Sequence, residues 1–203
     1  MNWIVFFTTQ KISYYVYKLN KGDRIVLKNR YNKDNKITIV LTGIIALAKI
    51  FCNKELLPLA ILGKNDIIDN NIADKTFYQI IALQTTYIVI LNEKNLYQHK
   101  IRKVYGNEII KCYQQTTKKY EETISIVTQR NKTKRVLLFI LIMFLRFGNI
   151  NKHKIIIPFK LTNNYTAIMT GTGIETVNKI TKKVYVHENT KISFIHIKNL
   201  KLI

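Results

Sequence analysis

The clearest chemical pattern in the chain lies between residues 161 and 184, in the stretch LTNNYTAIMTGTGIETVNKITKKV. Gly171 separates two short segments with helical periodicity, and the Thr162 hydroxyl can cap the first of them. In the second segment the apolar residues recur at the spacing of a buried helix face: Val177, Ile180 and Val184. The pattern predicts a helix-turn-helix, with a helical hairpin that does not bind DNA as the alternative.

The outward positions of the second helix carry groups that can contact base edges and phosphates: Ile174, Glu175, Asn178, Lys179 and Lys182. Residues 129–203 contain 14 lysines and arginines and 2 acids, a net +12 of the whole-chain +21. A basic field of this size around a helix pair is typical of a protein that binds DNA. The chain is also rich in Lys, Asn, Ile and Tyr, so part of the charge can instead reflect A/T-rich codons.

Other kinds of site have little support. Residues 170–173, TGTG, lack the length and the lysine of a phosphate-binding loop. The four histidines share no metal-ligand spacing, and Cys52 and Cys112 fit two reduced thiols. The longest apolar run, 136–145, is about half of a membrane span. We therefore expect no enzyme activity, no catalytic residue, no metal, no cofactor and no membrane partner.

These residues must be positioned by two kinds of structure. Strand-like runs separated by turn residues predict an antiparallel β-domain, at 23–28, 37–41, 44–51, 56–62, 77–82 and 87–91. Gly43 and Gly63 are expected to supply positive φ in its turns. After a short helix at 93–99, residues 107–128 predict one long helix. The polar segment 129–134 predicts a hinge.

The C-terminal part is predicted to contain a buried helix at 135–147, a strand at 155–158, the helix pair and a closing hairpin. That hairpin is expected between 192–197 and 200–203. The predicted organisation is thus a β-domain over 1–106, a long helix over 107–128 and a DNA-binding domain over 129–203.

The long helix carries a thin apolar seam whose residues are 3, 4 or 7 apart: Ile109, Ile110, Tyr113, Tyr120, Ile124 and Val127. A seam of this kind often pairs with its own copy in a dimer. A helix that lies on its own sheet would show the same pattern, so both interpretations stay open.

The whole pattern resembles the CRP/FNR family of transcription regulators, and within it the NtcA-type nitrogen regulators of cyanobacteria and red-algal plastids. QRNKTKRVLLFILIMFLRFGNI at 129–150 is similar to the family's hinge and following helix. LTNNYTAIMTGTGIETVNKITKKV is similar to its helix-turn-helix. KGDRIVLKNRYNKDNKITIVLTGIIALAKIF at 21–51 is similar to the first strands of its cyclic-nucleotide-binding β-roll. The resemblance implies an α+β fold with a cyclic-nucleotide-binding-like β-roll, a long dimerisation helix and a C-terminal winged helix-turn-helix.

By this resemblance the DNA-binding residues are Thr162, Thr172, Ile174, Glu175, Asn178, Lys179 and Lys182. The family usually has arginine at the positions of Ile174 and Lys179, and isoleucine cannot replace an arginine that grips guanine. Ile174 can instead meet a thymine methyl group or extend the core contact of Val177. Thr166 and Thr170 stand where the family prefers aliphatic residues, which indicates a degenerate copy.

The effector region departs further from the family. Residues 66–76 correspond to its anion-binding cassette but contain no glycine and no arginine. Nitrogen regulators hold 2-oxoglutarate with an arginine and a glutamate of the long helix. Glu121 corresponds to the glutamate, but the arginine position falls near Thr116. We expect neither cyclic nucleotide nor 2-oxoglutarate to bind.

The resemblance implies a transcription regulator that binds a palindromic site on double-stranded DNA as a homodimer, with a role in nitrogen control and RNA polymerase as a partner. It implies location in a red-algal plastid, encoded by the plastid genome, or otherwise in bacterial cytoplasm. The alternative function is a degenerate β-roll dimer that serves as a protein-interaction or structural module without specific DNA recognition.

Overall fold

The computed structural model describes residues 2–27, 36–69, 77–96, 99–184, 186–188 and 192–196, without the side chains of 99–104, 187 and 188. The chain divides into two compact units, Met1–Glu121 and Glu122–Ile203. The division falls inside the long helix α2, His99–Val127. No helix within the described ranges combines the length and the apolar content that a membrane crossing requires.

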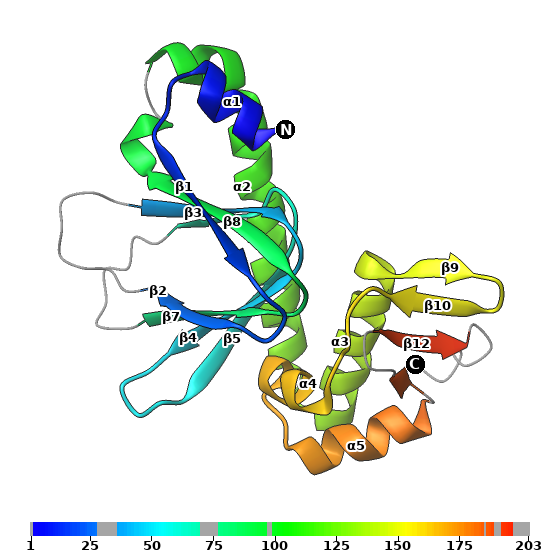
Figure 1. Cartoon of the computed structure of the whole chain (residues 1–203). Coiled ribbons are helices and arrows are strands. Elements are labelled where there is room, and N and C mark those ends of the chain that lie inside the picture. The colour runs from blue at the N-terminus through cyan, green and yellow to red at the C-terminus, as the bar shows by residue number, and fades with distance from the viewer. Residues whose placement is uncertain are drawn as a thin grey trace. The chain divides into compact units, whose positions relative to one another are not determined.

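Unit 1 is built from two four-stranded antiparallel sheets (Figure 1). One sheet has the order β1-β8-β3-β6, with β1 Tyr14–Leu19, β8 Thr86–Asn92, β3 Lys36–Thr42 and β6 Ile67–Asp69. The other has the order β2-β7-β4-β5, with β2 Arg24–Leu27, β7 Phe77–Ala82, β4 Ile45–Ile50 and β5 Leu56–Leu62. The six predicted strands are confirmed, and β1 and β6 are additional.

The sheet that contains β3 and β8 is covered on both faces. On one face, Val40 and Ile88 belong to a core shared with the second sheet. On the other face, Ile37 and Ile39 pack in a cluster that includes the N-terminal helix α1, Trp3–Thr9, and Ile109 of α2. Because side chains alternate along a strand, one strand can serve both cores.

The turns have the expected positive φ at Gly43 but not at Gly63. Gly43 has φ of +94°, and a Cβ there would lie 2.3 Å from Thr86 Oγ1, so only glycine fits. Gly63 does not have positive φ; Asn65 adopts it instead, with φ of 70°. Asparagine is among the residues that tolerate the left-handed region. The Asn65 side chain also makes a long-range contact, since its Oδ1 accepts a hydrogen bond from Trp3 Nε1 at 3.1 Å.

The segment before and within α2 differs from the prediction. The short helix expected at 93–99 is a single 3-10 turn, η1 Glu93–Asn95, and residues 97–98 lie outside the described ranges. Helix α2 starts at His99 rather than near 107. The predicted seam also divides: Ile109 is 5% exposed and packs on the unit's own core, whereas Ile110 and Ile124 are 54% and 58% exposed.

Unit 2 combines three helices with a four-stranded antiparallel sheet (Figure 1). The helices are α3 Lys132–Phe147, α4 Asn163–Thr170 and α5 Ile174–Lys183. The sheet order is β11-β12-β10-β9, with β11 His187–Glu188, β12 Ser193–His196, β10 Lys154–Ile157 and β9 Asn149–Asn151. Strand β12 pairs with β11 and β10, and residues 200–203 of the predicted hairpin lie outside the described ranges.

Candidate nucleic-acid interface

Helix α4 begins at the residue that the sequence predicts as its cap. Thr162 is extended, with φ of −69° and ψ of 149°, and its Oγ1 accepts a hydrogen bond from the Tyr165 amide at 3.3 Å. This bond satisfies one of the amides that a helix N-terminus leaves without an internal partner. Thr162 therefore has a defined structural role beside any contact with DNA.

The turn between α4 and α5 is set by Gly171. Its φ of 59° and ψ of 40° lie in the left-handed region. The Thr172 amide donates to Ala167 O at 3.1 Å and the Gly171 amide donates to Ile168 O at 3.3 Å. These two bonds form the glycine-based Schellman termination of a helix, which lets α5 start at once in a new direction.

The two threonines that replace aliphatic residues of the family pattern are both buried. Thr170 Oγ1 donates to Thr166 O at 2.7 Å and lies 2.8 Å from Thr172 Oγ1. Thr166 Oγ1 has no hydrogen-bond partner. Thr170 therefore fits the core through local hydrogen bonds, whereas Thr166 brings a polar atom into the core at some cost in stability.

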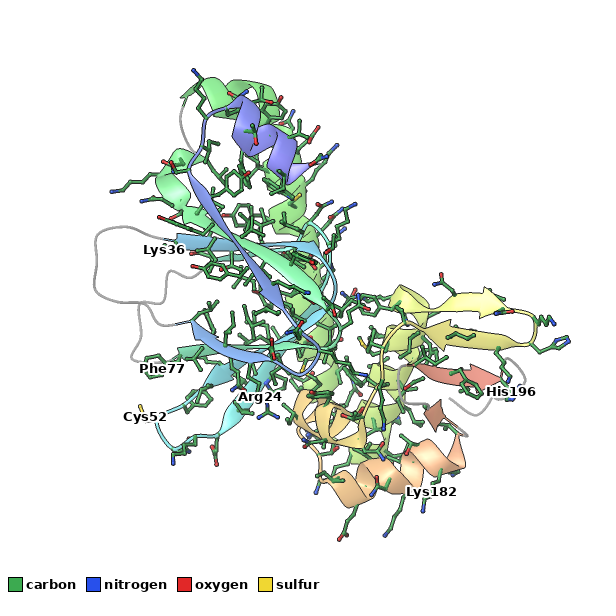
Figure 2. The ribbon with its side chains drawn as sticks, viewed as in Figure 1. Arg24, Lys36, Cys52, Phe77, Lys182 and His196 are labelled. Atoms are coloured by element: carbon green, nitrogen blue, oxygen red, sulfur yellow. The ribbon has the colours of Figure 1, made fainter. Side chains whose placement is uncertain are left out.

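Helix α5 separates a buried face from an exposed one. Val177 is fully buried, and the same face carries Ile180, Thr181 and Val184, exposed by 5%, 7% and 1%. The exposed face carries Ile174, Glu175, Lys179, Lys182 and Lys183, and Figure 2 shows Lys182 at the surface of the helix. Four of the predicted contact residues thus share one accessible surface, which we call the α5 face: Ile174, Glu175, Lys179 and Lys182.

Two further predicted residues are engaged within unit 2. Asn178 is half-buried, and its Oδ1 accepts a hydrogen bond from Asn163 Nδ2 at the start of α4. The Thr172 hydroxyl pairs with Thr170, as described above. Asn178 therefore fixes α5 against α4, and its amide nitrogen is the part of the side chain left to contact a base.

Arg135 of α3 is a residue that the sequence did not single out. Its Nε donates to Gln129 O at 2.5 Å, and its Nη1 donates to Gly171 O at 3.4 Å. One guanidinium thus joins the predicted hinge to the turn of the helix pair. The fixed fork of arginine donors suits such a double contact. The sequence does not distinguish Arg135 from its basic neighbours, because Arg130, Lys132 and Lys134 lie in the same segment.

The sheet of unit 2 adds a further cation. Lys154 of β10 lies with its Nζ 4.5 Å from the centroid of the Phe194 ring, and Phe194 contacts His196 edge-to-face at 6.1 Å. The turn between β11 and β12 includes residues 189–191, which lie outside the described ranges.

The region that the resemblance assigns to an effector pocket contains several polar contacts within unit 1. Thr116 is 2% exposed, and its Oγ1 accepts from the Ile67 amide at 3.0 Å and donates to Cys112 O at 3.0 Å. Asp66 accepts from the Gly63 amide at 2.6 Å and contacts the Lys119 ammonium. Glu121 is exposed on α2. Residues 70–76 of the predicted cassette lie outside the described ranges.

The same region of α2 holds a buried thiol, Cys112, and a partly buried phenol, Tyr120. Burial raises the pKa of the Cys112 thiol. Burial, and then the nearby Tyr78, raises the pKa of the Tyr120 phenol. Both groups stay protonated near neutral pH. No cluster of His, Cys, Asp or Glu suited to a metal ion occurs among the described residues.

Comparison with solved structures identifies the fold. A CooA mutant from Carboxydothermus hydrogenoformans superposes with a TM-score of 0.71 at 18% identity, over 96% of this chain and 89% of that one. A transcriptional regulator of the CRP/FNR family from Thermus thermophilus gives a TM-score of 0.63 at 17% identity, over 93% and 97% of the two chains. The chain has the fold of the CRP/FNR regulators.

Sequence comparison adds one relative. The protein ycf28 of Porphyra purpurea, whose name assigns it to the HTH-type transcriptional regulators, is 22% identical over 190 residues, 90% of this chain and 76% of its own length. No protein-family model matches the sequence. The names of these Porphyra purpurea and Thermus thermophilus proteins describe transcriptional regulators, and neither name describes an enzyme.

Proposed function

We propose that the chain is a DNA-binding transcription regulator of the CRP/FNR type, with α4 and α5 as the core of a winged helix-turn-helix. The observation that carries the proposal is the α5 face, an accessible row of side chains on a helix fixed by the Gly171 turn. It lies in a segment with a net charge of +12, which provides the electrostatic attraction that phosphates require.

We assign different tasks to the two ends of α5. Ile174 and Glu175 lie in its first turn, where the recognition helix of a helix-turn-helix contacts base edges. Lys179 lies at the third position that the resemblance assigns to base contacts, and Lys182, further along the helix, approaches phosphate. Thr162, Thr172 and Asn178 belong to the proposed interface as groups that orient the helix pair and approach the DNA through their remaining polar atoms.

The proposal includes a symmetric homodimer joined along α2. Ile110, Thr117 and Ile124 are all exposed and are seven residues apart, so they form one stripe on the helix, which we call the α2 stripe. A two-fold dimer places two copies of α5 on half-sites related by the same symmetry. The DNA target of such a dimer is a palindrome.

The proposal extends to nitrogen control, to a plastid location and to RNA polymerase as a protein partner. Support for the first two comes from the resemblance of 129–184 to NtcA-type regulators and from the similarity to a Porphyra purpurea protein. RNA polymerase follows from the same resemblance, since a regulator of transcription must influence that enzyme.

A degenerate dimer without specific recognition is the alternative that Ile174 and the altered cassette at 66–76 suggest, and the regulators among the relatives do not favour it. A salt series separates the two, with binding measured to the palindrome of nitrogen regulators and to random duplex of equal length. A regulator prefers one defined duplex by about 10³-fold or more at physiological salt.

The preferred sequence can differ from the palindrome of the family. Duplexes are therefore first selected from a random library, and the salt series is then repeated on the selected duplex. A selected palindrome with that preference supports the proposal. Equal affinity for selected and random duplex, with the same steep salt dependence for both, would overturn it. A duplex with one half-site scrambled is the matched control for dimeric binding.

A further inference from the structure

Ile174 is the only large apolar side chain exposed on α5, a helix whose residues are all described. It precedes Val177 by three residues, so helical periodicity alone would allow it to extend the buried face. In the structure Ile174 does not extend the buried face, because it is 49% exposed whereas Val177 is 0% exposed. The side chain therefore lies on the surface of the first turn, beside Glu175.

The neighbours of Ile174 limit what this turn can bind. Helix α5 contains no arginine, so it has no guanidinium fork for guanine O6 and N7. Glu175 is its one acid, and a carboxylate group only accepts hydrogen bonds. In the major groove the C5-methyl of thymine is the apolar group among the base edges. The thymine methyl group is therefore the base-edge group on which an exposed isoleucine at this position can pack.

We propose that Ile174 is a specificity-determining residue that selects a thymine in each half-site by packing against the thymine C5-methyl. The inference rests on the proposed function, since it requires α5 to enter the major groove. Glu175 lies next to Ile174 in the same turn and fits a cytosine amino group. The expected half-site therefore contains a thymine within one or two base pairs of a cytosine.

The expected size of the effect follows from methyl burial. Loss of one buried methyl group corresponds to about a fourfold loss of affinity. A palindrome presents two such methyl groups to a dimer, so their joint removal is expected to weaken binding by about 15-fold. Both values are well within the resolution of a binding titration.

The test uses the unaltered full chain and alters the DNA. After selection from random duplex, each thymine of the selected site is replaced by deoxyuridine, which lacks only the methyl group. We expect one symmetric pair of positions at which the replacement weakens binding about fourfold per half-site. In Ile174→Ala the same replacement should have no effect, as a double-mutant cycle requires.

The matched control variant is Ile150→Ala, because Ile150 is an exposed isoleucine of the same unit, on β9 rather than α5. It should keep the full deoxyuridine effect. If sequence-selective binding is present but no deoxyuridine position matters, or if the effect persists in Ile174→Ala, the inference is wrong and the proposed function stands. If no sequence is selected over random duplex, the proposed function fails and the inference with it.

Discussion

Lys119 of α2 forms an ion pair with Asp66, the residue before β6, and only 1% of the Asp66 side chain is exposed. The two residues are 53 positions apart in the sequence. Thr116, one turn earlier on α2, accepts a hydrogen bond from the Ile67 amide. These two contacts join the helix to the sheet, at the position that the sequence resemblance assigns to an effector site.

The first prediction concerns this ion pair. Lys119→Met should lower the free energy of unfolding by about 3 kcal/mol, because it leaves the Asp66 carboxylate buried without its cation. Urea unfolding of the variant measures the change. Lys118→Met, at an exposed neighbouring position, is the control and should differ from the parent by less than about 0.5 kcal/mol. Equal stability of the two variants would show that the pair does not hold the helix.

The second prediction concerns effectors. Saturating cyclic AMP or 2-oxoglutarate should leave the melting temperature unchanged, since Thr116 is buried and hydrogen-bonded at the position where an arginine would be needed. A ligand at 100 times its Kd would stabilise the native state by about 2.7 kcal/mol. The selected duplex serves as the positive control and should raise the melting temperature. A clear shift with either small molecule contradicts the prediction.

The third prediction concerns the α2 stripe. The protein should have about twice the monomer mass of 23.9 kDa by light scattering at micromolar concentration. Ile110→Lys combined with Ile124→Lys should give monomers, because it places like charges in the apolar stripe. Gln115→Lys, exposed on another side of the helix, should remain dimeric. A parent mass near 23.9 kDa would exclude the dimer under these conditions.

The fourth prediction concerns the division of tasks along α5. Glu175→Ala should change which sequences are selected, because a base contact affects preference at one position by about 1–3 kcal/mol. Lys182→Ala should weaken binding to every sequence and reduce the salt slope by about 1. Lys118→Ala removes the same charge from α2 and controls for net charge. An unchanged selected sequence with Glu175→Ala would mean that α5 does not contact bases in the family's manner.

The fifth prediction concerns Arg135. Arg135→Lys keeps the charge but cannot make both contacts to Gln129 O and Gly171 O, so the free energy of unfolding should fall by about 1–2 kcal/mol. Preference for the selected duplex over random duplex should fall as well, because the turn before α5 loses its support. Arg130→Lys, at an exposed position of the same segment, should change neither quantity. If Arg135→Lys and Arg130→Lys behave identically in both measurements, Arg135 has no positioning role.

Local patterns in the sequence determined much of the fold. Strand β5 could be predicted because it is a short apolar run between turn residues. The helix pair could be predicted because helical periodicity and a glycine turn involve residues close together in the sequence. The Gly171 turn is an example, since only a residue that tolerates the left-handed region ends α4 in this way. The family resemblance extended these local patterns to the order of the elements.

Tertiary structure decided what depends on residues far apart in the chain. The segment Trp3–Thr9 is rich in aromatic and β-branched residues that favour strands, yet it is helical, because the Phe6 ring packs on Tyr105 with 4.6 Å between centroids and Trp3 lies in the same cluster. The seam of α2 divides for the same reason. The side chain of Ile109 is buried against the core of its own unit, whereas that of Ile110 is exposed. The Asp66–Lys119 pair and the Arg135 contacts join segments whose proximity no local period encodes.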